Sequence, residues 1–392
     1  MRNAVIVSTA RTALAKSWRG GFNLTNPVTL GGAVIEAAVR QAGVSPEEVG
    51  DVILGCAQPE GASGNNIGRA SALRAGLPIS VAGQTVNRFC ASGLQALASA
   101  AQRIIADECD VVVAGGVESI SLVQNTLNMT MAHEQWLERN QPDLFWPMLK
   151  TAEVVAERYG ISKQRQDEYG VRSQQRASRA QADGIFAEEI IPVDTVMGIT
   201  DPESGALITR DVRVERDETI REGTTYAAVS AIRPALRGGV VSAGTASPFS
   251  DGASAVVMME ENEAHRRNLE PLGRFVGFAV AGCAPEEMGI GPALAVPKLL
   301  NRAGLTVDDI DLWELNEAFA SQVLYCQDEL GIPDELLNVN GGAIALGHPY
   351  GCSGARMAGH GLLEARRRQV KRVIVTMCVG GGQGAAALFE TM

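Results

Sequence analysis

Cys90 has the surroundings of a catalytic nucleophile. It lies in the stretch 85–93, and apolar residues then recur at helical spacing, at Leu94, Leu97, Ala98, Ala101 and Ile105. The cysteine is therefore expected to open a helix, where unpaired N–H groups and the positive end of the dipole stabilise a thiolate and lower its pKa. A small buried core cysteine fits the same pattern, so this stretch alone leaves both interpretations open.

Two glycine-rich stretches could supply the groups that such a nucleophile needs. The first, residues 340–349, contains His348, whose backbone the following proline restricts. It could act as a general base, although a single loop histidine commonly has no catalytic role. The second, residues 378–384, follows an apolar strand, and its glycines expose N–H groups that could form an oxyanion hole. It also fits G-x-G-x-x-A, but too few residues follow to complete a βαβ dinucleotide-binding unit.

An amide and a carboxylate lie in residues 313–319, where a strand is expected to pass into a helix. Asn316 is expected to cap a helix that begins at Glu317, because amide oxygens accept bonds from the first free N–H groups of helices. Its side chain could also hold a water molecule or an acyl oxygen. The two roles are compatible.

An internal repeat shows which elements must position these residues, because the first ~120 residues match the last ~120 at an offset of about 261 residues. The matching stretches are 43–49 with 304–310, 90–93 with 352–354, and 110–116 with 372–378. The third pair reads as a buried strand in both copies. We therefore predict two similar βαβ-type halves packed as one body.

The composition changes between the halves, from about residue 119 to residue 247. This insertion contains a long Gln/Arg/Glu-rich stretch at 153–182, which predicts helix with a solvated charged face. Alternating strands and helices elsewhere predict a layered α/β fold. Loops at the carboxyl ends of its strands are the expected place for a site.

The composition also excludes several classes of protein. With 34 Lys+Arg against 45 Asp+Glu, the net charge of -11 repels nucleic acid and anionic membrane surfaces. No apolar run has the ~18 residues of a membrane span, and no signal peptide is expected, so the sequence predicts a cytoplasmic protein. Seven thinly spread cysteines favour a reducing compartment. Four scattered histidines predict no metal site.

Together these motifs resemble the thiolase family over essentially the whole chain. The matching patterns are N-R-x-C-x-S-G at 87–93, N-E-A-F at 316–319, G-G-x-I-A-x-G-H-P at 341–349 and C-x-G-G-G at 378–382. The resemblance implies a five-layered αβαβα fold built from two βαβαβαββ halves and an inserted loop domain. Residues 1–118 with 248–270 would form the N-terminal half, 119–247 the loop domain over the site, and 271–392 the C-terminal half.

The resemblance also implies a role for each motif residue. Cys90 would be the acylated nucleophile, and His348 the base that activates it and a donor to the thioester oxygen. Cys378 would be the second acid/base. Asn316 would hold the water of one oxyanion hole, and the N–H groups of Cys90 and Gly380 would form the other.

Five further positions match places where thiolases contact their ligand. Arg221 and Ser247 would contact the nucleotide and pantetheine of coenzyme A. Met148, Met288 and Phe319 would line the acyl and pantetheine pocket, although such residues are more often plain core. The chain departs from the common family pattern at three places, which are Thr245 (usually Asn), Pro248 (frequently Gly) and the segment 122–149.

The activity implied is that of a 3-ketoacyl-CoA thiolase (acetyl-CoA C-acyltransferase), acting by ping-pong transfer through an acyl-cysteine. Pro147 before Met148 favours medium to long degradative substrates, since a histidine commonly stands there in acetoacetyl-specific members. The alternative is an acetoacetyl-CoA thiolase (acetyl-CoA C-acetyltransferase) working in condensation. Asn316 together with the second cysteine, Cys378, favours a thiolase over a decarboxylating ketoacyl synthase. A non-catalytic CoA- or lipid-binding relative would typically lose Cys90, His348 or Cys378, and all three are present. A redox-sensing dithiol protein that uses Cys90 and Cys378 is a remote alternative.

The resemblance further implies no permanently bound cofactor, with coenzyme A as a co-substrate. The expected partners are CoA thioesters and further copies of the chain, as a homodimer or homotetramer. A β-oxidation hydratase/dehydrogenase is a possible additional partner. Nucleic acid and a membrane span are not expected.

Overall fold

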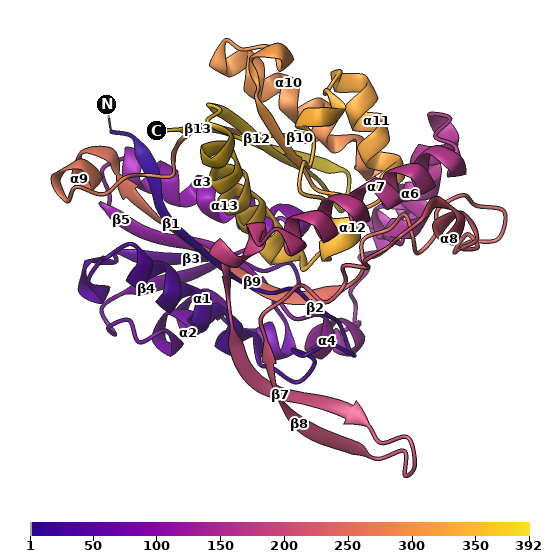
Figure 1. Ribbon diagram of the computed structural model, residues 1–392, viewed down its shortest axis with the longest axis horizontal. Helices are drawn as coiled ribbons and strands as arrows, with labels where there is room; N and C mark the ends of the chain where they lie inside the picture. The colour runs from indigo at the N-terminus through magenta and orange to yellow at the C-terminus, as the bar shows by residue number, and fades with distance from the viewer. Residues whose placement is uncertain (1) are drawn as a thin grey trace.

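Two halves of similar topology share one mixed sheet in the computed structural model, which describes residues 2–392 (Figure 1). The strand order is β11-β12-β13-β10-β1-β9-β5-β3-β4. These strands are β1 (Ala4–Thr12), β3 (Asp51–Gly55), β4 (Ala82–Val86), β5 (Val111–Glu118), β9 (Ser250–Glu260), β10 (Gly273–Gly282), β11 (Leu312–Leu315), β12 (Arg372–Val379) and β13 (Gln383–Thr391). The short strands β2 (Ala15–Lys16) and β6 (Ile190–Ile191) pair with β9 and β1.

The internal repeat is visible in this strand order. β1 and β10 meet antiparallel at the centre, where Val5 pairs with Arg274. Outward from them, β9, β5 and β3 on one side correspond to β13, β12 and β11 on the other, and β4 extends the first half alone. The repeated turns also agree, because Gly43 and Gly304 both have left-handed backbones, with φ of 62° and 68°.

Helices cover both outer faces and fill the space between the halves, which gives five layers and confirms the predicted fold class. Figure 1 shows α10 (Gly291–Ala303) and α11 (Ala320–Leu330) on one side and α1 (Pro27–Gln41) and α2 (Ile67–Arg74) on the other. Between them lie α3 (Ser92–Ile105) and α13 (Tyr350–Arg368), which contact each other. The crossing is close, because a Cβ placed at Gly93 would lie 2.5 Å from the Gly351 carbonyl oxygen. Glycine is therefore required there.

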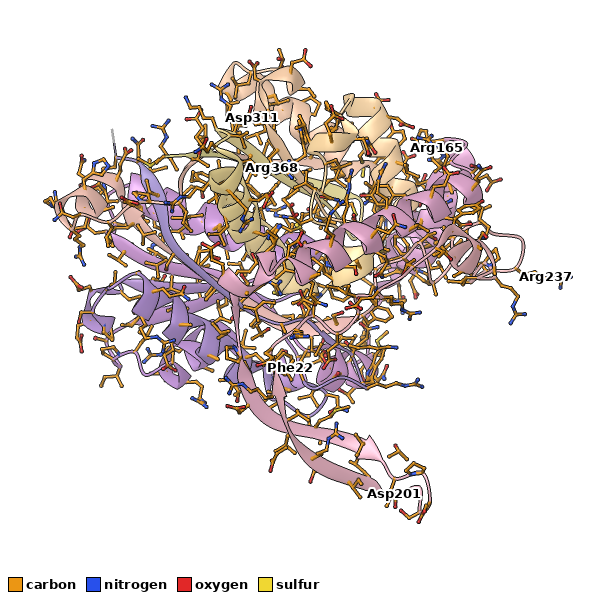
Figure 2. All side chains as sticks on the ribbon, in the orientation of Figure 1. Phe22, Arg165, Asp201, Arg237, Asp311 and Arg368 are labelled. Carbon is orange, nitrogen blue, oxygen red and sulfur yellow. The ribbon has the colours of Figure 1, made fainter. Side chains whose placement is uncertain are left out.

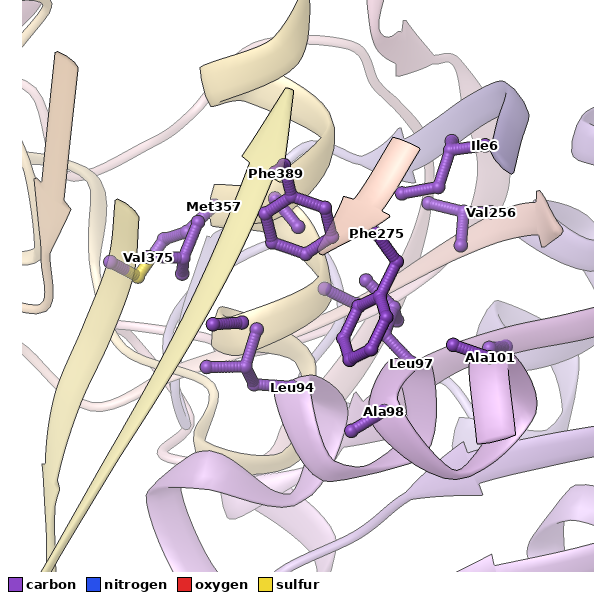
Figure 3. Close-up of a cluster of buried hydrophobic side chains, with 14 of the residues drawn as sticks. Ile6, Leu94, Leu97, Ala98, Ala101, Val256, Phe275, Met357, Val375 and Phe389 are labelled. Atoms are coloured by element: carbon purple, nitrogen blue, oxygen red, sulfur yellow. The ribbon is translucent and has the colours of Figure 1, made fainter. Parts of the chain in front are cut away.

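The core between the halves is an apolar cluster contributed by the middle helices and the facing strands (Figure 3). Phe275 and Phe389 meet edge to face, with ring centroids 5.9 Å apart. Full burial of one such side chain contributes roughly 1.5–3 kcal/mol. Of the apolar residues that recur at helical spacing after Cys90, Ile105 is 40% exposed, and the neighbouring Ile104 is buried.

The insertion supplies most of the remaining elements. These are α4 (Ile120–Val123), α5 (Gln135–Asn140), α6 (Met148–Arg158), α7 (Lys163–Ala182), α8 (Tyr226–Ser230) and the hairpin β7 (Val193–Thr200) with β8 (Leu207–Val214). The hairpin extends from the body, with Asp201 near its tip (Figure 2). Two short helices complete the chain, α9 (Glu261–Arg266) and α12 (Ala343–Leu346).

The helical stretch expected at 153–182 is two helices, α6 and α7, separated by a turn in which Gly160 has a φ of 67°. Charged residues of α7 such as Arg165, Glu168 and Arg179 are exposed, whereas the opposite face of the helix is buried. Tyr169 and Ser173 of α7 are buried and donate hydrogen bonds to the two carboxylate oxygens of Glu317, at 2.8 and 2.7 Å. A buried carboxylate therefore anchors the insertion to the C-terminal half.

None of the helices in the described residues 2–392 is long and apolar enough to cross a membrane. No group of three or more histidine, cysteine, aspartate or glutamate side chains in this range is arranged to hold a metal ion.

Candidate active site

The strand ends of the two halves bring the candidate residues together. Cys90 follows β4, Asn316 follows β11, and Cys378 and Gly380 lie at the end of β12. The parallel pairs β3–β4 and β11–β12 end in the same direction within each half, where α/β folds place their sites. Gly380 N–H donates a hydrogen bond to Cys90, and Asn316 Nδ2 lies 3.3 Å from His348 Nε2. Cys378 is close enough to Cys90 for their charges to interact.

The turn that carries Cys90 is held in an unusual backbone conformation. The 3₁₀ turn Phe89–Ala91 leads directly into α3, and Phe89 has a φ of 43°. Asn87 Oδ1 accepts a 2.7 Å hydrogen bond from Phe89 N–H, and Ser92 Oγ accepts one of 2.9 Å from Arg88 N–H. Left-handed backbone at a residue other than glycine costs on the order of 1–3 kcal/mol and persists where its surroundings impose it.

The expectation that the helix end lowers the pKa of Cys90 is wrong. Loss of surrounding water is the largest effect and raises this pKa to about 12, and the charge of Glu118 raises it further. The hydrogen bond from Gly380 N–H acts in the opposite direction and is smaller. Burial therefore outweighs the helix terminus. Cys90 is a neutral thiol in the free chain and needs a base before it can attack.

His348 has the protonation state that a base requires. It is buried at the start of α13, and burial is the main cause that lowers its pKa to about 3, with the positive charge of Arg356 adding to the effect. The imidazole is consequently neutral at any pH at which an enzyme normally works. One of its nitrogens has a free lone pair that can accept the Cys90 proton.

These two pKa shifts predict the pH dependence of Cys90 alkylation. Since the thiolate fraction rises about tenfold per pH unit below the pKa, the rate of iodoacetamide labelling should rise steadily from pH 7 to 10. Peptide mapping by mass spectrometry isolates the rate at Cys90, and the Cys90→Ser variant gives the background. A rate that levels off near pH 7 would show a thiolate–imidazolium pair and contradict the neutral pair.

Asn316 does not cap a helix. The helix that follows it, α11, begins at Ala320, and its first turn has no side-chain cap. Asn316 is instead buried, and its backbone oxygen accepts a 2.8 Å bond from the side-chain amide of Gln322. Its Oδ1 has no hydrogen-bond partner among the described residues. A buried amide oxygen of this kind favours a polar ligand or a water molecule at the site.

The glycine loop after β12 has a left-handed backbone, which exposes its N–H groups. Gly381 and Gly382 have φ of 79° and 83°, and a Cβ at Gly382 would lie 2.3 Å from the Cys283 carbonyl oxygen. Cys378 precedes this loop and is fully buried, so burial raises its pKa well above the usual value. Cys378 is therefore a protonated thiol that can donate a proton.

The three residues expected to line the acyl pocket lie together beside Cys378. Met288 is buried against this cysteine, and the half-buried Met148 and Phe319 pack against the same small apolar cluster. A Cβ at Gly380 would lie 3.7 Å from the sulfur of Met148. The structure thus places an apolar surface directly next to the thiols.

Only one of the two residues expected to contact coenzyme A lines a pocket. Arg221 lines a pocket of about 380 Å³, together with Lys16 and Pro248. Ser247 does not line this pocket, because its N–H and Oγ both bond to the carbonyl of Ala318, at 3.0 and 3.1 Å. Pro248 connects the pocket to the catalytic residues, since its carbonyl accepts a 3.1 Å bond from the N–H of His348.

Sequence reasoning missed a buried carboxylate next to the thiols. Glu118, at the end of β5, accepts bonds from the N–H groups of Ala57, Gln58 and Gly351, at 2.8, 3.0 and 2.8 Å. The bond to Gly351 ties the start of α13 to the N-terminal half. The available signal was a glutamate at the end of an apolar strand. A carboxylate buried there needs hydrogen-bond donors around it, so its presence indicates a polar site at the strand end.

Comparisons with known proteins agree with this fold and this arrangement of thiols. The family model "Thiolase, N-terminal domain" matches residues 4–262, and "Thiolase, C-terminal domain" matches residues 269–391. A duplicated five-layered fold with a cysteine and a neutral histidine at its strand ends defines a class of acyl-transfer enzymes. The chain belongs to the thiolase family and is an acyltransferase.

Similar proteins cover the whole chain. It is 44% identical to the 3-ketoacyl-CoA thiolase of Bacillus subtilis, over 100% of both chains. It is 42% identical to the peroxisomal 3-ketoacyl-CoA thiolase of Homo sapiens, over 99% of this chain and 91% of the human protein. The crystal structure of the Bacillus anthracis acetyl-CoA acetyltransferase matches with a TM-score of 0.89 and 38% identity, over 100% of this chain and 99% of that one.

Proposed function

We propose that the chain is a 3-ketoacyl-CoA thiolase that cleaves its substrate with coenzyme A to acetyl-CoA and a shortened acyl-CoA. The observation that carries this proposal is the convergence of a neutral thiol, a neutral imidazole and a second protonated thiol at one group of strand ends. Thiolysis needs a nucleophile for C3, a base to activate it and an acid for the departing enolate. The site offers one group for each.

In the first half-reaction, His348 takes the proton of Cys90 and the sulfur attacks C3 of the substrate. The N–H groups of Cys90 and Gly380 stabilise the negative oxygen, and one such donor is typically worth roughly 2.7–4 kcal/mol. The C2–C3 bond then breaks, and its electron pair forms the enolate of acetyl-CoA. Cys378 protonates that enolate, while a water on Asn316 together with His348 stabilises its oxygen.

In the second half-reaction, coenzyme A attacks the acyl group held by Cys90. The Cys378 thiolate takes the proton of the incoming thiol, which restores the Cys378 thiol. The C–S bond to Cys90 breaks, and the leaving sulfur recovers its proton from His348. Each group returns to its starting state, so no redox or metal step is needed.

We propose that the pocket containing Arg221 receives the nucleotide part of coenzyme A. The guanidinium and the Lys16 ammonium would attract phosphate in a chain that is otherwise acidic. Ser247 lies next to Pro248 of this pocket and is anchored to Ala318, which neighbours Phe319. These contacts support the proposal that pantetheine runs from the pocket toward the thiols.

The expected substrates are medium to long 3-ketoacyl-CoA thioesters. The apolar cluster of Met148, Met288 and Phe319 lies beside Cys378. Each methylene that finds apolar surface contributes about 0.8 kcal/mol, nearly fourfold in binding. We expect kcat/KM for thiolysis to rise from C4 to C8 or beyond when C4, C6, C8 and C12 substrates are compared.

The alternative is an acetoacetyl-CoA thiolase, and the structural likeness to an acetyl-CoA acetyltransferase favours it. A maximum of kcat/KM at C4 that falls steeply with chain length would reject the degradative proposal in favour of this alternative. A variant of the apolar cluster provides a further test. Met148→Ala shortens one side chain of this cluster and should change the ratio of kcat/KM for the C8 substrate to kcat/KM for the C4 substrate. The exposed Met131→Ala is the control, since Met131 lies on the surface of the insertion.

We also propose the division of the chain stated from the sequence, with residues 1–118 and 248–270 as the first half, 119–247 as the loop domain and 271–392 as the second half. The pairing of β9 with β1 and β5 supports the return of the chain to the first half. A homodimer or homotetramer is supported by β4, whose outer edge is unpaired within the described chain. We place the protein in the cytoplasm because its cysteine usage favours a reducing compartment.

A further inference from the structure

Ser353 lies on the first turn of α13 and contacts the base on the side away from Asn316. Its hydroxyl oxygen is 2.6 Å from His348 Nδ1 and 3.0 Å from the carbonyl oxygen of Pro349. Ser353 and His348 are both 3% exposed, so bulk water does not compete for these bonds. Asn316 Nδ2 lies 3.3 Å from the other ring nitrogen, Nε2.

The Ser353 hydroxyl has one proton and two acceptors within reach, the Pro349 carbonyl and His348 Nδ1. When the hydroxyl donates to Pro349, as serines in helices often do toward the carbonyl four residues earlier, the serine oxygen accepts a hydrogen bond from Nδ1–H. Nε2 then keeps its lone pair, which faces the amide of Asn316.

We propose that Ser353 is a positioning residue that holds His348 in the Nδ1–H tautomer, so that Nε2 is available as the base for Cys90. This inference rests on the proposed function, because it assigns how the base of that reaction is oriented. The hydrogen bond at Nδ1 decides which nitrogen of a histidine is free. Without the serine, the buried ring can turn or carry its proton on Nε2, and it then has no lone pair at the reacting side.

The test compares Ser353→Ala with the conservative Ser353→Thr. Loss of the hydroxyl should lower kcat for thiolysis by on the order of 10- to 100-fold, by analogy with the loss caused by removing a partner that orients a metal-bound histidine. KM should change little, because Ser353 does not face the substrate. Ser353→Thr keeps a hydroxyl at the same place and should restore most of the rate. Ser71→Ala is the matched control, since it removes a buried serine hydroxyl in α2, on the outer layer.

A second measurement reads the tautomer without using activity. Nitrogen NMR of the ¹⁵N-histidine-labelled protein distinguishes a protonated Nδ1 from a protonated Nε2, and the His348→Gln variant identifies the signal among the four histidines. The wild-type protein should show protonated Nδ1, and Ser353→Ala should shift the signal toward protonated Nε2 or an average.

The outcomes separate this inference from the proposed function. Protonated Nε2 in the wild type, or a Ser353→Ala variant with unchanged kcat and unchanged nitrogen shifts, would overturn the role of Ser353. A wild-type protein with the Nδ1–H tautomer but no thiolysis of any 3-ketoacyl-CoA would overturn the proposed function and leave the tautomer assignment standing. A loss of rate that Ser353→Thr does not restore, with unchanged nitrogen shifts, would reduce Ser353 to a structural residue.

Discussion

Replacement of Cys90 by serine is expected to reduce kcat for thiolysis by at least on the order of 10³-fold. An alcohol is far less acidic than a thiol and a weaker nucleophile, so transfer of its proton to His348 is much less favourable than transfer from Cys90. The serine would also form an ester in place of a thioester, which coenzyme A attacks less readily. The measurement is kcat for steady-state thiolysis, and circular dichroism checks that the variant is folded.

The matched control is another cysteine of the repeat. Cys352 occupies the corresponding place in the second half but is buried in an apolar cluster with Leu14 and Leu346. Cys352→Ser should therefore leave kcat nearly unchanged. A Cys90→Ser variant that retains more than a tenth of the wild-type kcat would remove Cys90 from the role of nucleophile.

Loss of either acid/base group should have the second largest effect. His348→Ala and Cys378→Ser should each lower kcat by on the order of 10²-fold or more, as expected for positioned proton-transfer groups. The variants should differ in the step that fails. Without His348 the Cys90 thiol, whose pKa is raised to about 12, is not activated, so acylation slows. Without Cys378, the enolate and the incoming coenzyme A lack their proton partner.

Rapid-mixing measurements can separate these steps. His348→Ala should lose the burst of acyl-enzyme formation from acetyl-CoA. An essential Cys352 together with a dispensable Cys378 would show that the second thiol has been assigned to the wrong half of the repeat.

The fold could be predicted from the sequence because the matching stretches form equivalent elements in the two halves. The match of 110–116 with 372–378 corresponds to β5 and β12, and the matching turns at Gly43 and Gly304 share a left-handed backbone. Such features depend on neighbouring residues, so they are readable along the chain. The motif residues could be found for the same reason, because each lies next to glycines or at the end of an apolar strand.

The properties of the site depend on contacts between distant segments and could not be predicted in this way. The pKa of Cys90 follows from burial between both halves, which outweighs the helix end visible in the sequence. Asn316 was expected to cap a helix, but its amide faces His348, 32 residues further along the chain. Ser353 and His348 are only five residues apart in the sequence. Their contact could still not be predicted, because it depends on the orientation of the imidazole ring, which only the structure shows.

The most direct test of the acyl-cysteine mechanism is mass spectrometry of the intact wild-type chain after mixing with acetyl-CoA, followed by peptide mapping. We expect one acetyl group per chain, on the peptide that contains Cys90, and its loss when coenzyme A is added. Cys90→Ser should show no adduct, and Cys352→Ser should show the wild-type adduct. An acetyl group on any other cysteine, or no adduct under conditions of active turnover, would contradict the account.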